Sequence, residues 1–179
     1  MLIIMGGLPG TGKTSLARSL ASHLDAVHVR IDSIEQAIKA SGKLRGPIWD
    51  AGYRSGCAIA EDNLRLGRTV IADAVNPLRI SRAAWRSVAE VAGVRSIEIK
   101  LICSDTDEHK RRVETRASDI PGHNVPTWRE VMTQDYEPGR TRRPVAWQDC
   151  PTFRSVKIAG THNCRVKQAY VFLIGGVLD

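Results

Sequence analysis

The chain has 179 residues, of which 42% are hydrophobic and 25% charged, a composition typical of one ordinary globular domain. A domain of this length buries roughly 70% of the surface that its unfolded chain exposes, so it needs no disulfide or metal to fold. The net charge of +7 favours anionic partners, without separating a nucleotide from a phosphorylated metabolite or a nucleic acid.

The cysteines and the apolar runs suggest the setting in which the protein works. Cys57, Cys103, Cys150 and Cys164 contain no C-x-x-C pair and no histidine at zinc-ligand spacing, so we expect reduced thiols and no zinc site. No stretch reaches the ~18 apolar residues of a membrane-spanning helix, and the apolar run at the N-terminus is too short for a signal peptide. We therefore expect a cytoplasmic monomer or homodimer without membrane contact.

The first motif along the chain is a glycine-rich loop with the sequence GGLPGTGKT at residues 6–14. Residues 7–14 match G-x-x-x-x-G-K-[ST] without a mismatch, between an apolar strand at residues 2–5 and a helix at residues 15–24. A strand, a glycine-rich turn and a helix are the context that a phosphate-binding loop requires. The predicted nucleotide-binding residues are Gly7, Leu8, Pro9, Gly10, Thr11, Gly12, Lys13, Thr14 and Ser15.

A second strand, predicted at residues 26–31, leads into a carboxylate at Asp32 and a helix at residues 34–39. In open α/β sheets ligands bind at the carboxyl ends of the strands, which makes Asp32 a candidate for catalysis. The structural alternative is an N-cap of the following helix, for which Ser33 is the better residue.

A third strand, predicted at residues 68–73, ends at Asp73, the arrangement of a Walker B element. It follows a polar turn at residues 41–47 and a long helix at residues 48–66. Magnesium prefers oxygen ligands near the transferred phosphate, which Thr14 and Asp73 could supply directly or through water. We therefore predict a Mg²⁺ site formed by Thr14 and Asp73.

Arginines concentrate on a helix predicted at residues 108–116. Arg112 and Arg116 are four residues apart and therefore share a helical face. The planar fork of an arginine can follow the negative charge that develops during phosphoryl transfer. A solvated, salt-bridged surface helix is the alternative. Because residues 117–126 have the composition of a loop, we favour a short lid over about residues 112–129, with Arg112 and Arg116 as catalytic residues.

Strands and helices alternate along the rest of the chain. Further elements are expected at residues 78–92 (helix), 94–103 (strand), 128–136 (helix capped by Thr127), 153–159 (strand) and 164–178 (helix). This alternation predicts an α/β fold, a three-layer α/β/α sandwich around a parallel five-stranded sheet. No linker divides the chain, so residues 1–179 are expected to form a single domain.

In this combination the chain resembles the P-loop kinases of small molecules. It is similar to ATP-binding kinases of the AAA_33 type, which are relatives of zeta toxins, chloramphenicol phosphotransferase, gluconate kinase and polynucleotide kinase. The resemblance covers roughly residues 1–140 and implies ATP and Mg²⁺, with Lys13 on the β- and γ-phosphates and Thr14 on magnesium. It also implies that Asp32 is the base toward the acceptor and that lid arginines assist. We therefore expect an ATP-dependent kinase that phosphorylates a hydroxyl group of a small molecule.

Other functions remain open at this stage. A nucleotide-binding switch that hydrolyses its nucleotide without an acceptor is one, although the chain has no N-K-x-D tract that would favour GTP. A nucleic-acid 5′-hydroxyl kinase is favoured by the net charge. It is disfavoured because Ser33-Ile34-Glu35 follows Asp32, where polynucleotide kinases and many AAA_33 members carry an arginine. A toxin-like kinase acting on nucleotide sugars fits the residues as well, so the acceptor is unassigned.

Overall fold

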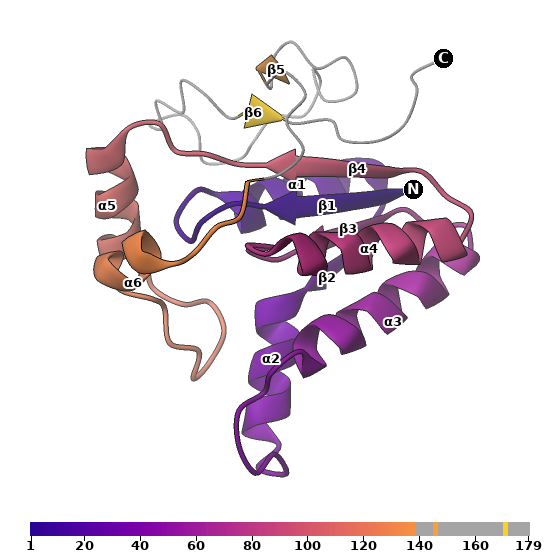
Figure 1. Cartoon of the computed structure of the whole chain (residues 1–179), viewed down its shortest axis with the longest axis horizontal. Coiled ribbons are helices and arrows are strands. Elements are labelled where there is room, and N and C mark those ends of the chain that lie inside the picture. The colour runs from indigo at the N-terminus through magenta and orange to yellow at the C-terminus, as the bar shows by residue number, and fades with distance from the viewer. Residues whose placement is uncertain (139–144, 147–169, 172–179) are drawn as a thin grey trace.

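The computed structural model describes residues 1–138, 145–146 and 170–171, and its centre is a parallel four-stranded sheet (Figure 1). The strands are β1 (Leu2–Gly6), β2 (Val27–Arg30), β3 (Val70–Asp73) and β4 (Ser96–Lys100), in the order β2-β3-β1-β4. The predicted parallel sheet is thus confirmed with four strands. The fifth strand, expected at residues 153–159, and the helix expected at 164–178 lie outside the described residues. A short antiparallel pair, β5 (Val145–Ala146) and β6 (Tyr170–Val171), was not predicted.

Helices cover both faces of the sheet, which confirms the three-layer α/β/α architecture (Figure 1). They are α1 (Lys13–Leu24), α2 (Ile31–Ala40), α3 (Ala51–Arg65), α4 (Arg79–Val91), α5 (Thr106–Thr115) and α6 (Trp128–Thr133). Helix α1 packs on one face, whereas α3 and α4 pack on the other. Within the described part of the chain, no helix has the length and apolarity needed to cross a membrane.

The strand order creates a switch point between β1 and β3. The connection from β1 through α1 leads to β2, on the far side of β3, whereas the connection from β3 through α4 leads to β4 on the far side of β1. Neighbouring strands whose connections leave in opposite directions open a crevice at their carboxyl ends, where α/β proteins bind ligands. The loops after Gly6 and Asp73 border this crevice.

Strand β1 separates the two halves of the core. Ile3 and Met5 pack with Leu20 of α1 on one face, whereas Leu2 and Ile4 pack with Trp85 of α4 on the other. All five residues of β1 are buried. A parallel strand covered on both faces has this continuous apolar character, and it fixes the phosphate loop that follows β1 to the most buried part of the sheet.

The predicted boundary between the second strand and its helix is wrong. Strand β2 ends at Arg30, and α2 begins at Ile31, so Asp32 lies in the first turn of a helix rather than at a strand end. The N-cap position is Arg30, so neither Asp32 nor Ser33 caps the helix. Ile31 is buried and continues the alternation of the strand, a pattern that does not separate the end of a strand from the start of a helix. Helix α3 likewise begins at Ala51, three residues later than predicted.

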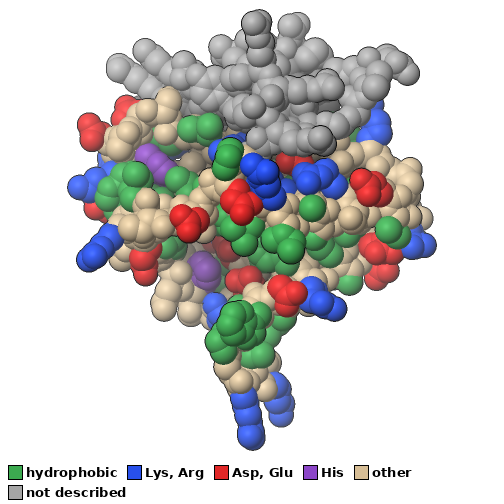
Figure 2. Space-filling model, viewed as in Figure 1, with side chains coloured by type: hydrophobic (Ala, Val, Ile, Leu, Met, Phe, Trp, Pro, Cys, Tyr) green, Lys and Arg blue, Asp and Glu red, His purple; other side chains and the backbone are tan. Residues whose placement is uncertain are grey.

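The connection between α2 and α3 projects from the body of the molecule, at the bottom of Figure 1. Basic side chains gather at its tip in Figure 2, and the exposed residues of this segment include Lys43 and Arg45. These side chains do not line the crevice at the switch point. They are therefore solvated charges in this structure.

A fully buried asparagine, Asn76, fastens the loop after β3 to its surroundings. Its Nδ2 donates to the carbonyl of Met5 at 2.5 Å, and its Oδ1 accepts from Trp85 Nε1 at 3.1 Å. Its backbone N–H donates to Tyr53 Oη at 3.3 Å. The φ of Asn76 is 49°, in the left-handed region that asparagine tolerates better than most residues. This side chain therefore holds the end of β3 against β1 and α4.

We predict that Asn76→Ala lowers the free energy of unfolding by about 2–4 kcal/mol, because two buried groups lose their partners and the backbone becomes strained. Urea unfolding followed by circular dichroism measures the change. Asn63→Ala is the matched control, because the Asn63 side chain donates to the Ile59 carbonyl on the surface of α3 and its loss should cost less than about 1 kcal/mol. Equal losses in the two variants would contradict the role of Asn76.

Candidate active site

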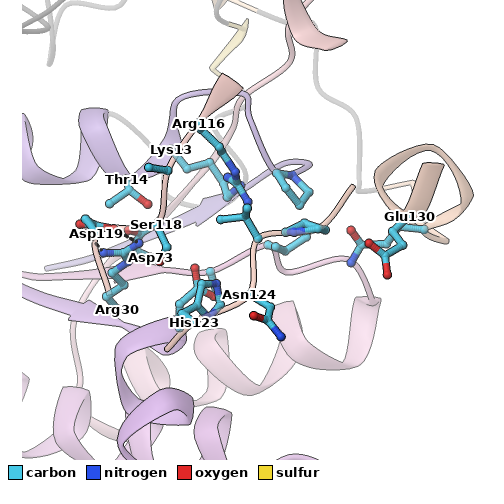
Figure 3. A pocket seen from close by; sticks show the side chains of 18 of the residues that line it. Lys13, Thr14, Arg30, Asp73, Arg116, Ser118, Asp119, His123, Asn124 and Glu130 are labelled. Carbon is cyan, nitrogen blue, oxygen red and sulfur yellow. Dashed lines mark hydrogen bonds and ion pairs between the residues drawn. The ribbon is translucent and has the colours of Figure 1, made fainter. Parts of the chain in front are cut away.

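A cavity of about 540 Å³ lies at the switch point (Figure 3). It is lined by the phosphate loop, by the ends of β2 and β3, and by the loop that follows α5. Of the residues predicted from the sequence, the lining includes Pro9, Lys13, Thr14, Asp32, Asp73 and Arg116. The fold thus brings together residues that are more than a hundred positions apart in the chain, whereas Arg112 is not part of the lining.

The backbone of the phosphate loop depends on glycine at two positions. Gly7 has a φ of 128° and Gly10 a φ of 84°, both left-handed. A Cβ on Gly7 would lie 2.3 Å from the carbonyl oxygen of Leu101, and one on Gly10 would lie 2.6 Å from Val113 Cγ2. The loop leads directly into α1, whose first turn has no acidic residue and no side-chain cap. The free amides at this helix end are therefore open to a phosphate.

Lys13 is a buried cation in this loop. Its Nζ donates to the Leu8 carbonyl at 2.9 Å, an oxygen that also accepts from Thr11 Oγ1 at 2.8 Å. Burial lowers the pKa of Lys13 to about 8; the carboxylates of Asp73 and Asp32 act in the opposite direction. An anion arriving beside Nζ would favour the charged form and offer a stronger acceptor than the shared carbonyl.

Asp73 lies at the end of β3 and is buried. Its Oδ2 is 3.0 Å from Nε2 of His28 on β2, and it lines the cavity together with Thr14. The described residues contain no cluster of three or more histidines, cysteines or carboxylates placed to hold a metal. A carboxylate and a hydroxyl beside a phosphate site nevertheless fit Mg²⁺, which usually takes only one or two protein oxygens and completes its shell with phosphates and waters.

Asp32 lines the cavity from the first turn of α2. Glu35 follows one turn later and is partly buried, and this burial, together with the neighbouring charge of Asp32, raises the pKa of Glu35 while Lys39 lowers it. Glu35 does not line the cavity. Asp32 is thus the carboxylate of this helix that faces the enclosed space.

The two arginines predicted as a pair have different surroundings. Arg116 follows the last residue of α5 and lines the cavity, close to Lys13 in Figure 3. Its Nε is buried and has no hydrogen-bond partner among the described residues. Arg112 donates from Nε to Glu108 Oε1 at 2.8 Å, within α5. Arg112 therefore belongs to the salt-bridged helix considered as an alternative and keeps a buried Nη2 without a partner among the described residues, whereas Arg116, with its unpartnered Nε, lines the cavity.

Sequence reasoning missed His109, a buried residue on α5. Its Nε2 is 2.7 Å from the Pro9 carbonyl, and its ring meets Trp128 edge to face at a centroid distance of 5.2 Å. Helices α5 and α6 are thereby attached to the phosphate loop. The phosphate-loop motif does not predict a contact with a residue a hundred positions away. The only sequence signal for burial of His109 is its place four residues before the apolar Val113, on the same helical face.

Asp119 is a second residue that the sequence did not single out. It lies in the loop between α5 and α6, where its carboxylate accepts from Nη1 and Nη2 of Arg30 at 2.9 Å each and from Arg18 Nη2. Arg30 and Arg18 hold the pKa of Asp119 well below its ordinary value. The segment expected to form a lid is thus attached to the end of β2 and to α1.

Solved structures share this fold. The comparison with Kti12 from Chaetomium thermophilum in complex with ADP-AlF3 gives 23% identity and a TM-score of 0.61, and covers 87% of this chain and 95% of that one. The APS kinase CysC from Mycobacterium tuberculosis, in complex with AMPPNP and APS, is 21% identical with a TM-score of 0.55, over 78% of this chain and 83% of that one.

A protein from Chloroflexus aurantiacus assigned as a kinase is 22% identical, with a TM-score of 0.57. The comparison covers 64% of this chain and 65% of that one, so this chain spans slightly less than two thirds of its length. At such identities the likenesses establish the fold alone, which is that of P-loop kinases. No curated protein matches the chain. The model of AAA_33, an AAA domain, matches residues 2–134, and because this match spans most of the chain, the protein belongs to the AAA_33 family.

Proposed function

We propose that the protein is an ATP-dependent kinase that transfers the γ-phosphoryl group to a hydroxyl of a small molecule. The observation that carries this proposal is one cavity lined by a phosphate loop with a buried lysine, a carboxylate at Asp32 and an arginine with a free buried donor at Arg116. Binding of a nucleotide would by itself need only the phosphate loop. The additional carboxylate and arginine are the groups that phosphoryl transfer to a hydroxyl requires.

The relatives with the same fold support ATP as the nucleotide. The M. tuberculosis APS kinase binds AMPPNP, an ATP analogue, and Kti12 binds ADP with AlF3. The chain lacks the N-K-x-D tract that would favour GTP. In our proposal the amides of residues 10–14 hold the β-phosphate at the start of α1, and Lys13 exchanges the Leu8 carbonyl for oxygens of the β- and γ-phosphates. Mg²⁺, held by Thr14 and Asp73, would neutralise charge on these phosphates.

In the proposed transfer step, Asp32 and Arg116 have separate roles. The acceptor oxygen attacks the γ-phosphorus while the bond to the β-phosphate oxygen breaks, which releases ADP. Asp32 accepts the proton that the acceptor hydroxyl loses. Arg116 donates from its unpartnered Nε to an oxygen of the group in transfer, where negative charge develops. His109 keeps the phosphate loop in place through Pro9 and is a positioning residue.

The test of this function is a transfer assay. Purified protein with γ-labelled ATP and Mg²⁺ is incubated with pools of sugars, nucleosides, nucleotide sugars, antibiotics and oligonucleotides. Label recovered in a small-molecule pool supports the proposal. Label recovered only in oligonucleotides would assign a nucleic-acid 5′-hydroxyl kinase instead, and slow hydrolysis without transfer to any pool would assign a nucleotide-dependent switch.

With an acceptor in hand, we predict that Asp32→Asn lowers kcat by about 10²–10⁴-fold, because the proton of the acceptor hydroxyl loses its base. The Kd for ATP, measured by calorimetry, should change less than about twofold, since Asp32 does not belong to the phosphate loop. Asp62→Asn removes an exposed carboxylate of α3 and should leave both quantities unchanged. Full activity in Asp32→Asn would remove Asp32 from the mechanism.

The two arginines are predicted to differ. Arg116→Ala should lower kcat by about 10³-fold or more, because the group in transfer loses a charged donor. Arg112→Ala should lower kcat less than about tenfold, since Arg112 is engaged with Glu108 and does not line the cavity. Steady-state kinetics of both variants at saturating ATP make the comparison. A larger loss for Arg112→Ala would reverse the assignment.

A further inference from the structure

The carboxylate of Asp119 is bound by two arginines, Arg30 and Arg18, in an arrangement that would also suit an external anion. The Asp119 carboxylate is gripped by both Nη atoms of Arg30 at 2.9 Å, and Oδ2 accepts a further bond from Arg18 Nη2. Two parallel N–H···O bonds from a guanidinium are the geometry with which arginine recognises carboxylates and phosphates. Two arginines therefore contact one carboxylate, and the negative charges of Asp32 and Asp73 also act on Arg30.

Arg30 is the fixed part of this arrangement. It lies at the end of β2 with only 14% of its side chain exposed, and its Nε is buried without a hydrogen-bond partner in the described part of the chain. A buried donor without a partner costs free energy, which an additional acceptor would recover. The Asp119 carboxylate occupies the two Nη atoms and leaves Nε without a partner in the described part of the chain.

Asp119 is the replaceable part. Its side chain is 46% exposed, and that of Arg18 is 56% exposed. It belongs to the loop between α5 and α6, outside any helix or strand. An ion pair between two side chains this exposed is weak, which applies to Arg18 and Asp119, so an external anion has mainly to displace the two bonds from Arg30.

Arg30 lies close enough to the proposed reaction site to bind part of the acceptor. Arg30 lines the main cavity and also a second one of about 310 Å³, which Arg18 lines too. The second cavity has apolar walls that include Val29, Ile34 and Ile59. Asp32 is two residues beyond Arg30. A small molecule held by its anionic group at the arginines would therefore have room beside Asp32 for a hydroxyl.

We infer that Arg30 and Arg18 form an anion subsite for a small acceptor that carries a phosphate or carboxylate group, and that Asp119 occupies this subsite until the acceptor binds. The inference rests on the proposed kinase function, because it assigns a chemical class to the acceptor. The acceptor's anion replaces Asp119 on the arginines, and the loop between α5 and α6 is released from this contact at the same time.

The test uses inorganic phosphate as the probe and the full-length protein saturated with AMPPNP and Mg²⁺, so that the phosphate loop is filled. Asp119→Asn removes the internal competitor's charge. We expect it to lower the Kd for phosphate, measured by calorimetry, by about tenfold or more, which corresponds to about 1.4 kcal/mol. Adding Arg30→Gln to Asp119→Asn should abolish the gain. Malonate in place of phosphate tests the preference for a carboxylate.

The control is Glu61→Gln. Glu61 accepts from Nε and Nη2 of Arg65 at 3.0 and 2.8 Å, a similar two-bond pair on α3 away from the cavity. Its loss changes the net charge equally and should leave the phosphate Kd unchanged. An unchanged Kd for both anions in Asp119→Asn, an equal gain in Glu61→Gln, or a gain that survives Arg30→Gln would overturn the subsite.

The subsite and the kinase function fail separately. If AMPPNP does not bind the unmodified protein, the proposed function is lost, but the Arg30-dependent part of phosphate binding can still be measured without nucleotide. If AMPPNP binds and label is transferred to an acceptor without an anionic group, the kinase function stands and the subsite is overturned as an acceptor site.

Discussion

The parallel pairing of β1 with β3 is the constraint on which the site depends. Its register places Met5 beside Asp73, so the phosphate loop and the candidate metal ligand leave the sheet next to each other. The buried Asn76 side chain secures this arrangement by bonding the Met5 carbonyl. Because β2 pairs with the other side of β3, Arg30 lies opposite Asp73, and α2 then carries Asp32 to the same edge. The strand pairing thus brings Arg30, Asp32 and Asp73 to one edge of the sheet before any ligand binds.

The cationic side chains of the site lack some of their hydrogen-bond acceptors, which would lead the site to prefer anionic ligands. Lys13 is buried against a shared carbonyl, and Arg116 and Arg30 each keep a buried Nε without a partner among the residues described. Desolvated cations with spare donors favour anions with several oxygens. The chain satisfies part of this demand with its own Asp119. A nucleotide at the phosphate loop and an anionic acceptor at Arg30 would satisfy the rest.

Short-range patterns predicted the parts of the site that lie at strand ends. The phosphate loop, Asp73 and the alternation of strands and helices depend on local periodicity and on one specific motif, and the structure places them as expected. The sequence did not locate the start of α2, because the buried Ile31 fits a strand and a helix equally well. His109, His28 and the contact of Asp119 with Arg30 depend on pairings 45 to 100 residues apart, which no local pattern reports.

The most direct measurement is amide hydrogen exchange with and without AMPPNP and Mg²⁺. If the phosphate loop holds the nucleotide and the loop after α5 closes the cavity, exchange should slow in residues 7–15 and in residues 116–127 together. Lys13→Ala should remove both effects, since it deletes the cation that meets the phosphates. Unchanged exchange in residues 7–15, or protection confined to other segments, would contradict a nucleotide site at this loop.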